Sequence, residues 1–132
     1  MDILQYISTP KETSEADPLT TIIKLTRGRL AGGALYFPSG PAGKLHFIAR
    51  IGEHQIIPFN TGQNLRLDDC VLPLSIGIDL LEPPFELICE TWNDSTLYAH
   101  ALTLFLNLEP MIDKDHDIKT LINKFWFYGG KD

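Results

Sequence analysis

Residues 70–80 read Cys-Val-Leu-Pro-Leu-Ser-Ile-Gly-Ile-Asp-Leu, and this stretch decides the fold class. Every second residue from Cys70 to Leu80 is apolar or a cysteine, whereas a valine, a proline, a serine, a glycine and an aspartate stand between them. This period of two is typical of a β-strand with one buried face. Pro73 has no amide hydrogen to donate to a neighbouring strand, which places it at a sheet edge, a strand start or a bulge.

The segments on either side of this stretch also favour strands. Residues 45–51 and 85–90 alternate in the same way, and residues 21–26 are rich in β-branched side chains. The leucine-rich residues 98–108 fit a strand or a helix. We interpret them as a strand because a hairpin-like turn at residues 92–95 precedes them.

Glycines punctuate the first half of the chain. Gly28, Gly32 and Gly33 predict a bend or bulge before a strand at residues 34–37. Six or seven strands, with turn signals roughly every ~8–12 residues, are typical of a sandwich or barrel. Strands do not alternate with long amphipathic helices, which argues against a parallel α/β fold. The expected fold is mainly all-β, with an antiparallel β-sandwich or jelly-roll-like core over residues 21–110.

The N-terminal residues 1–20 are expected to form an extended arm. Residues 8–20 are polar, contain two prolines and show no period, so they cannot offset their ordering entropy by burial within the segment. A short apolar patch precedes them, formed by Ile3, Leu4, Tyr6 and Ile7. This patch either docks onto a neighbouring subunit or packs on its own domain.

The C-terminal residues 111–132 are expected to form a helix and tail, with the helix near residues 115–128. Its apolar stripe follows the spacing i, i+3, i+4, i+7 and consists of Ile118, Leu121, Ile122 and Phe125. The stripe runs into four consecutive aromatic residues, Phe125, Trp126, Phe127 and Tyr128. These four point around most of the helix, so one domain face cannot cover them all and they indicate an interface. Deleting residues 115–132 is then expected to abolish self-association or docking.

Composition narrows the function classes. The 132 residues suit one domain, and 44% hydrophobic with 21% charged residues is ordinary for a globular protein. A net charge of −6 with scattered Lys and Arg residues argues against nucleic-acid binding. No apolar run is long enough to span a bilayer, and residues 1–6 do not resemble a signal peptide, so we expect no membrane partner and a cytoplasmic protein. Cys70 and Cys89 are then expected to be buried thiols, and a disulfide requires neighbouring strands.

No motif for catalysis or metal binding survives inspection. The four histidines, His46, His54, His100 and His116, lack metal-ligand spacing, and strand histidines are more often hydrogen-bonded or at the surface. Glu82, Glu86, Glu90 and Asp94 offer a carboxylate pair for glycoside hydrolysis, but Glu86 and Glu90 have outward parity and fit a solvated sheet face. We therefore expect no enzyme, no cofactor and no metal.

Aromatic side chains keep a second function open. Tyr36, Trp92, Tyr98 and Trp126 are the aromatic residues expected to be partly exposed. Aromatic platforms bind sugars and anchor protein interfaces, although such residues also fill cores. The alternative function is thus a ligand-binding β-sandwich module of the carbohydrate-binding type, using Trp92.

A set of turn and strand signals carries a family resemblance. It comprises Phe37-Pro38-x-Gly40-x-Ala42-Gly43-x-Leu45, Ile57-Pro58-x-Asn60, Asp68-Asp69, Leu81-x-Pro83-Pro84-Phe85-x-Leu87 and Trp92-Asn93-Asp94-Ser95-Thr96-x-x-x-His100. Over residues 21–110 the chain resembles small β-sandwich proteins of tailed-phage particles, of the capsid decoration and head–tail type. The resemblance implies a non-enzymatic structural protein that acts through subunit contacts. Its partners would be copies of itself, other virion proteins or both, in a virion assembled in the host cytoplasm.

Overall fold

A computed structural model describes residues 1–110 of the chain. They form an all-β structure of two four-stranded antiparallel sheets, in which the strand orders are β1-β8-β3-β6 and β2-β7-β4-β5. The strands are β1 (Asp2–Thr9), β2 (Leu19–Lys24), β3 (Gly28–Phe37), β4 (Leu45–Ile51), β5 (His54–Ile57), β6 (Cys70–Leu80), β7 (Glu86–Asn93) and β8 (His100–Pro110). Within these residues no helix occurs, and so none could cross a membrane.

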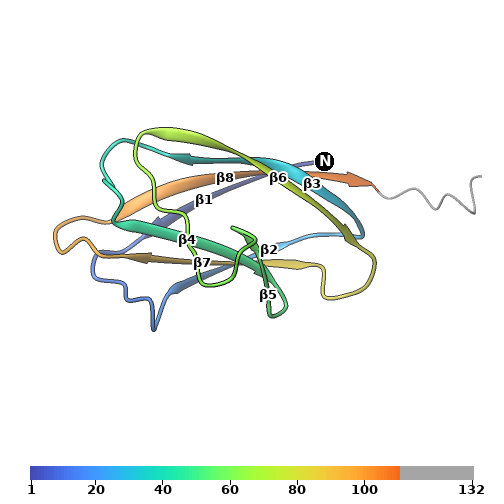
Figure 1. The fold of residues 1–132 in the computed structure, drawn as a ribbon, viewed down its shortest axis with the longest axis horizontal. Helices are drawn as coiled ribbons and strands as arrows, with labels where there is room; N and C mark the ends of the chain where they lie inside the picture. The colour runs from blue at the N-terminus through green and yellow to red at the C-terminus, as the bar shows by residue number, and fades with distance from the viewer. Residues whose placement is uncertain (111–132) are drawn as a thin grey trace, which may run out of the picture.

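The two sheets lie as two layers, with β1, β8, β3 and β6 in one and β2, β7, β4 and β5 in the other (Figure 1). Burial alternates along strands such as β1, β3 and β8, and buried residues of both sheets join one hydrophobic cluster. Its fully buried side chains include Phe37 of one sheet and Phe47 of the other. Period-two burial of this kind is the physical basis of the fold, because a strand presents successive side chains to opposite faces.

The strands expected at residues 45–51 and 70–80 are confirmed with those bounds. Strand β6 pairs only with β3, so Pro73 lies on an edge strand as expected. The leucine-rich segment is a strand, β8. The expected bulge also occurs in β3, where the pairing register shifts between Leu30 and Gly32.

The expectation of an N-terminal arm over residues 1–20 is wrong. Residues 2–9 form β1, which pairs with β8 along its whole length, from Asp2 opposite Asn107 to Thr9 opposite His100. Ile7 is 2% exposed in the core and Ile3 packs against it, so these two residues of the patch pack on their own domain, whereas Leu4 and Tyr6 are exposed. β1 is ordered by backbone pairing with β8, a strand about a hundred residues later in the chain. These backbone hydrogen bonds help to offset the conformational entropy lost on ordering, which burial of the segment's own side chains could not offset alone.

The polar connection from β1 to β2 is also fastened to the domain. The Glu12 amide donates to the Ser95 carbonyl at 2.9 Å, and the Asn93 amide donates to the Thr13 carbonyl at 3.0 Å. Residues 10–18 therefore run across the end of β7. Residues 111–132, and with them the expected C-terminal helix and its stripe, lie outside the described residues.

The two cysteines stand in different sheets. Cys70 begins β6 and Cys89 lies in β7, and both are free thiols. Cys89 is buried, as expected, and burial raises its pKa to about 12, so it stays a neutral thiol in the core. Cys70 is half-buried.

Candidate interaction surfaces

The outer side of the sheet β1-β8-β3-β6 carries two uncharged rows of side chains. The strand registers place Leu4, Phe105, Ala34 and Pro73 in one row across all four strands. They place Tyr6, Thr103, Tyr36 and Val71 in the next row. We call these eight residues the apolar face.

Large side chains of the apolar face are open to solvent. Leu4 is 72% exposed, Tyr6 is 65% exposed and Val71 is 59% exposed, and Tyr36 and Phe105 are also exposed. Single exposed apolar residues are ordinary, but two adjacent rows form a continuous patch. Cross-strand neighbours in antiparallel sheets lie about 5 Å apart, so these side chains touch or nearly touch. Such a patch is the usual mark of a protein-binding surface.

The outer side of the other sheet, β2-β7-β4-β5, carries ion pairs beside apolar residues such as Ile22. Lys24 Nζ donates to Glu86 Oε1 at 2.8 Å, and Arg50 Nε donates to Glu90 Oε1 at 3.2 Å. Glu86 and Glu90 thus have the outward parity expected of them and pair with basic side chains on neighbouring strands. This arrangement is that of a solvated sheet face.

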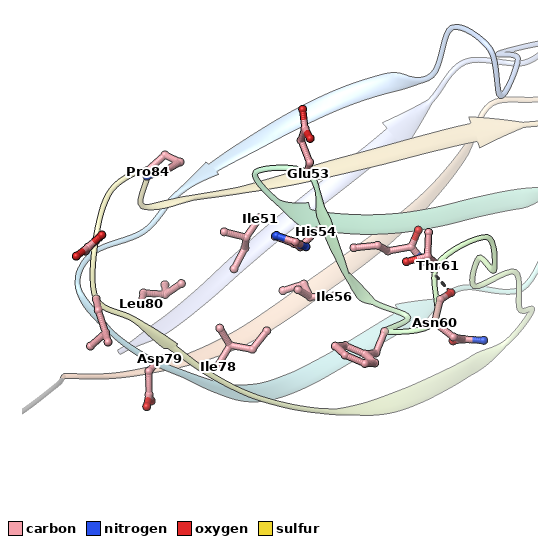
Figure 2. Close-up of a pocket in the computed structure, with 14 residues that line it drawn as sticks. Ile51, Glu53, His54, Ile56, Asn60, Thr61, Ile78, Asp79, Leu80 and Pro84 are labelled. Carbon is pink, nitrogen blue, oxygen red and sulfur yellow. Dashed lines mark hydrogen bonds between the residues drawn. The ribbon is translucent and has the colours of Figure 1, made fainter.

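A groove lies between the free edges of the two sheets, where β5 faces β6. It has a volume of about 880 Å³, within the range of ligand sites. Figure 2 shows Ile51, Ile56, Ile78 and Leu80 directed into it from both layers. The remaining lining residues are Glu53, His54, Gln55, Phe59, Asn60, Thr61, Asp79, Leu81, Glu82 and Pro84.

The rim of the groove is acidic and partly apolar. Glu53 and Asp79 lie on opposite sides of it (Figure 2), and Glu82 lies in the turn after β6. Among the described residues that line it there is no Lys or Arg. Asp79 is paired with Arg29 at 2.8 Å outside the groove, whereas Phe59 at the rim is 81% exposed.

One glutamine holds the loop that carries Phe59. The Gln55 amide nitrogen donates to the carbonyls of Pro58 at 2.8 Å and Gln63 at 2.9 Å. Two bonds from a single side chain fix both ends of this loop beside β5. Phe59 is therefore held at the rim although it contributes nothing to the core.

A third feature is a buried histidine. His46 stacks on Trp92, with ring centroids 5.0 Å apart and planes 6° apart. Its Nε2 lies 2.6 Å from Asp94 Oδ2, and its Nδ1 lies 2.7 Å from Asn64 Oδ1. His46 is 5% exposed, and the interpretation of a hydrogen-bonded strand histidine is confirmed. It joins the loop of Asn64 and the turn of Asp94 to the sheet.

The exposure expected of the aromatic residues is correct for two and wrong for one. Tyr98 is 68% exposed and Tyr36 is 44% exposed. Trp92 is only 5% exposed, because one of its ring faces is stacked on His46. It cannot serve as an open platform for a sugar ring, and Trp126 lies outside the described residues.

One acidic residue away from these surfaces, Asp68, accepts hydrogen bonds from backbone amides. Asp68 Oδ1 accepts hydrogen bonds from the amides of Ala42 and Gly40, each at 2.9 Å, and these bonds lower the pKa of Asp68 from 3.8. The residues described by the structure contain no group of three His, Cys, Asp or Glu side chains arranged to hold a metal ion.

Of the residues that the sequence singled out for an interface, Leu4 and Tyr6 belong to the apolar face, while Ile3 and Ile7 point into the core. The sequence-based interpretation missed Phe105, Val71 and Pro73 on the same face. Their outward parity in two predicted strands was a usable signal, but the order of the strands in the sheet was not known. The groove was missed for the same reason.

Comparison of the chain with protein-family models, with curated proteins and with solved structures found no match.

Proposed function

We propose that the chain is a non-enzymatic structural protein that assembles with copies of itself through the apolar face. The observation that carries this proposal is the pair of uncharged, solvent-open rows across β1-β8-β3-β6. Burying such rows against a partner removes apolar area from water at about 25 cal/mol per Å². A second copy is the favoured partner because a two-fold interface places the same patch on both subunits.

Charge supports this choice of surface. Each chain has a net charge of −6, so two copies repel each other through most approaches. The two rows of the apolar face contain no charged side chain, and the paired charges of the opposite sheet are already satisfied within one chain. Association through the apolar face therefore leaves no buried charge unpaired.

The finer fold that goes with this proposal is a jelly-roll β-sandwich. An eight-stranded jelly roll consists of two facing sheets. The strand orders β1-β8-β3-β6 and β2-β7-β4-β5 support it, because most successive strands lie in opposite sheets. The setting we propose is a virus particle, as a capsid decoration or tail accessory protein in contact with itself or other virion proteins. The support for that setting is the resemblance over residues 21–110.

The test is the mass of the full chain in solution, by light scattering across a concentration series. Phe105→Glu places a charge in the middle of the apolar face, and it should weaken association about thirtyfold or more, as for a central interface residue. Ile22→Glu is the matched control, because Ile22 is 51% exposed in β2, on the other sheet. A chain that is monomeric at all concentrations, or equal loss in both variants, would refute the proposal.

A further inference from the structure

We infer that the groove between β5 and β6 is the docking site for residues 118–128 of the same chain. This inference is independent of self-association through the apolar face. It rests on the composition of the groove, the composition of the segment and the place where β8 ends.

The groove offers apolar surface that the described residues leave uncovered. Leu81 is 54% exposed and Phe59 is 81% exposed at its rim, above a floor that includes Ile78 and Leu80. Glu53 and Glu82 add negative charge at the rim without a basic partner among the lining residues. The ligand that fits this surface has an apolar body and positive charges beside it.

Residues 118–131 of the chain have that composition. They contain seven large apolar or aromatic residues and three lysines, Lys119, Lys124 and Lys131, but no aspartate or glutamate. Three acidic residues of the C-terminal part precede them, Asp113, Asp115 and Asp117, and one follows them, Asp132. The segment therefore carries the charge opposite to that of the groove rim.

The topology brings the start of this segment close to the groove. Pro110, the last described residue, is opposite Gly28 of β3, and Gly28 is in turn opposite Leu80 of β6. Two strand spacings of about 4.8 Å separate Pro110 from Leu80, or roughly 10 Å in all. Residues 111–117 can span up to about 23 Å when extended. Figure 1 shows β8 ending at the same end of the molecule as the turn between β6 and β7.

This proximity favours docking within one chain over docking between chains. A short connection gives the tethered segment an effective concentration on the order of millimolar. A second copy would have to reach that concentration to compete. Docking in the same chain is therefore independent of protein concentration in dilute solution.

The experiment measures acrylamide quenching of Trp126 fluorescence in the full chain. The signal of Trp126 is obtained by subtracting a Trp126→Phe variant, because the other tryptophan, Trp92, is buried. Docking should protect Trp126 from the quencher equally across a hundredfold dilution series. Leu81→Asp puts a carboxylate into the groove and should weaken docking about tenfold or more, so that quenching rises. Leu97→Asp is the matched control, because Leu97 is 70% exposed in the turn between β7 and β8.

Protection that is lost in Leu81→Asp but kept in Leu97→Asp supports the inference. Quenching as in a free indole in the unaltered chain overturns it, and so does protection that Leu81→Asp leaves unchanged. Protection that appears only at concentrations where the chain associates, and that Phe105→Glu removes, also overturns it. That last result would still support the apolar face as an interface between copies. Conversely, a chain that stays monomeric and protects Trp126 at every concentration would refute the interface and support docking in the groove.

Discussion

The two sheets share one core but present different outer surfaces. On β1-β8-β3-β6 the outward residues include the apolar face, and on β2-β7-β4-β5 they include the ion pairs Lys24–Glu86 and Arg50–Glu90. Both sheets contribute buried residues to the same hydrophobic cluster, so the core alone does not require this difference. The sheet β1-β8-β3-β6 also carries the ion pair Arg29–Asp79, but the eight residues of the apolar face include no charged side chain, and this part of the surface is the one open to a partner.

The contrast between the two sheets can be tested first at the backbone of β1-β8-β3-β6. A Cβ atom at Gly33 would lie 1.8 Å from the carbonyl oxygen of Phe105. Gly33→Ala must therefore push β3 away from β8, and we expect it to lower the free energy of unfolding by about 3 kcal/mol. Urea unfolding followed by circular dichroism measures this.

The matched variant in the charged sheet is Gly52→Ala, at the turn between β4 and β5. A Cβ atom there would meet nothing within 4 Å, and the only cost is the positive φ of 59°. We expect a loss of about 1 kcal/mol. Equal losses at the two positions would show that the tight approach of β3 and β8 is not needed for stability.

The charged face can be tested by removing one half of an ion pair. Arg50 and Glu90 are 32% and 22% exposed, and Arg50 also donates to the Gly52 carbonyl. We expect Arg50→Gln to lower the free energy of unfolding by about 1 kcal/mol, less so in high salt. Lys24→Gln removes the other pair, in which Lys24 is 77% exposed, and should cost about 0.3 kcal/mol or less. A larger effect of Lys24→Gln in thermal unfolding would contradict this order.

The smallest effect concerns Asp68, which precedes β6 where the chain passes from one sheet to the other. Because its pKa in the folded chain is lowered from 3.8 by the amides of Ala42 and Gly40, the folded chain binds fewer protons than the unfolded chain. Its contribution to stability is present above about pH 4 and is lost as the pH falls through the lowered pKa. In Asp68→Asn the urea midpoint should fall less between pH 6 and pH 3.

The control for this measurement is Asp69→Asn, because the neighbouring carboxylate does not accept the Gly40 and Ala42 amides. Its pH dependence should match that of the unaltered chain. A slope in Asp68→Asn as steep as in the control would show that the two amide bonds do not stabilise the folded state.

Whether a strand could be predicted from the sequence depended on how much its inner and outer faces differ in polarity. Strands β4 and β6 were predicted with their bounds, because apolar residues occupy every second, inward-facing position along them. Strand β1 was missed because Leu4 and Tyr6, on its outer side, are as apolar as Ile3 and Ile7 on its inner side. A strand that is apolar on both sides has no period to detect.

The candidate surfaces were less predictable than the strands. Leu4 and Tyr6 were singled out, but their neighbours across the sheet depend on pairings between strands far apart in sequence. The burial of Trp92 likewise depends on His46, which belongs to a different strand. Local patterns give parity along one strand, and they do not say which strands lie side by side.

The pairing of β1 with β8 has a consequence for synthesis of the chain. β1 leaves the ribosome before the other described strands, and its single partner in the sheet, β8, is the last of them. Until residues 100–110 emerge, the backbone amides and carbonyls of β1 and its aliphatic side chains have no native neighbour in the sheet. Long-range pairing of this kind slows folding and exposes unpaired edges on the way. The six described strands between β1 and β8 are thus synthesised before β1 can form its native pairing.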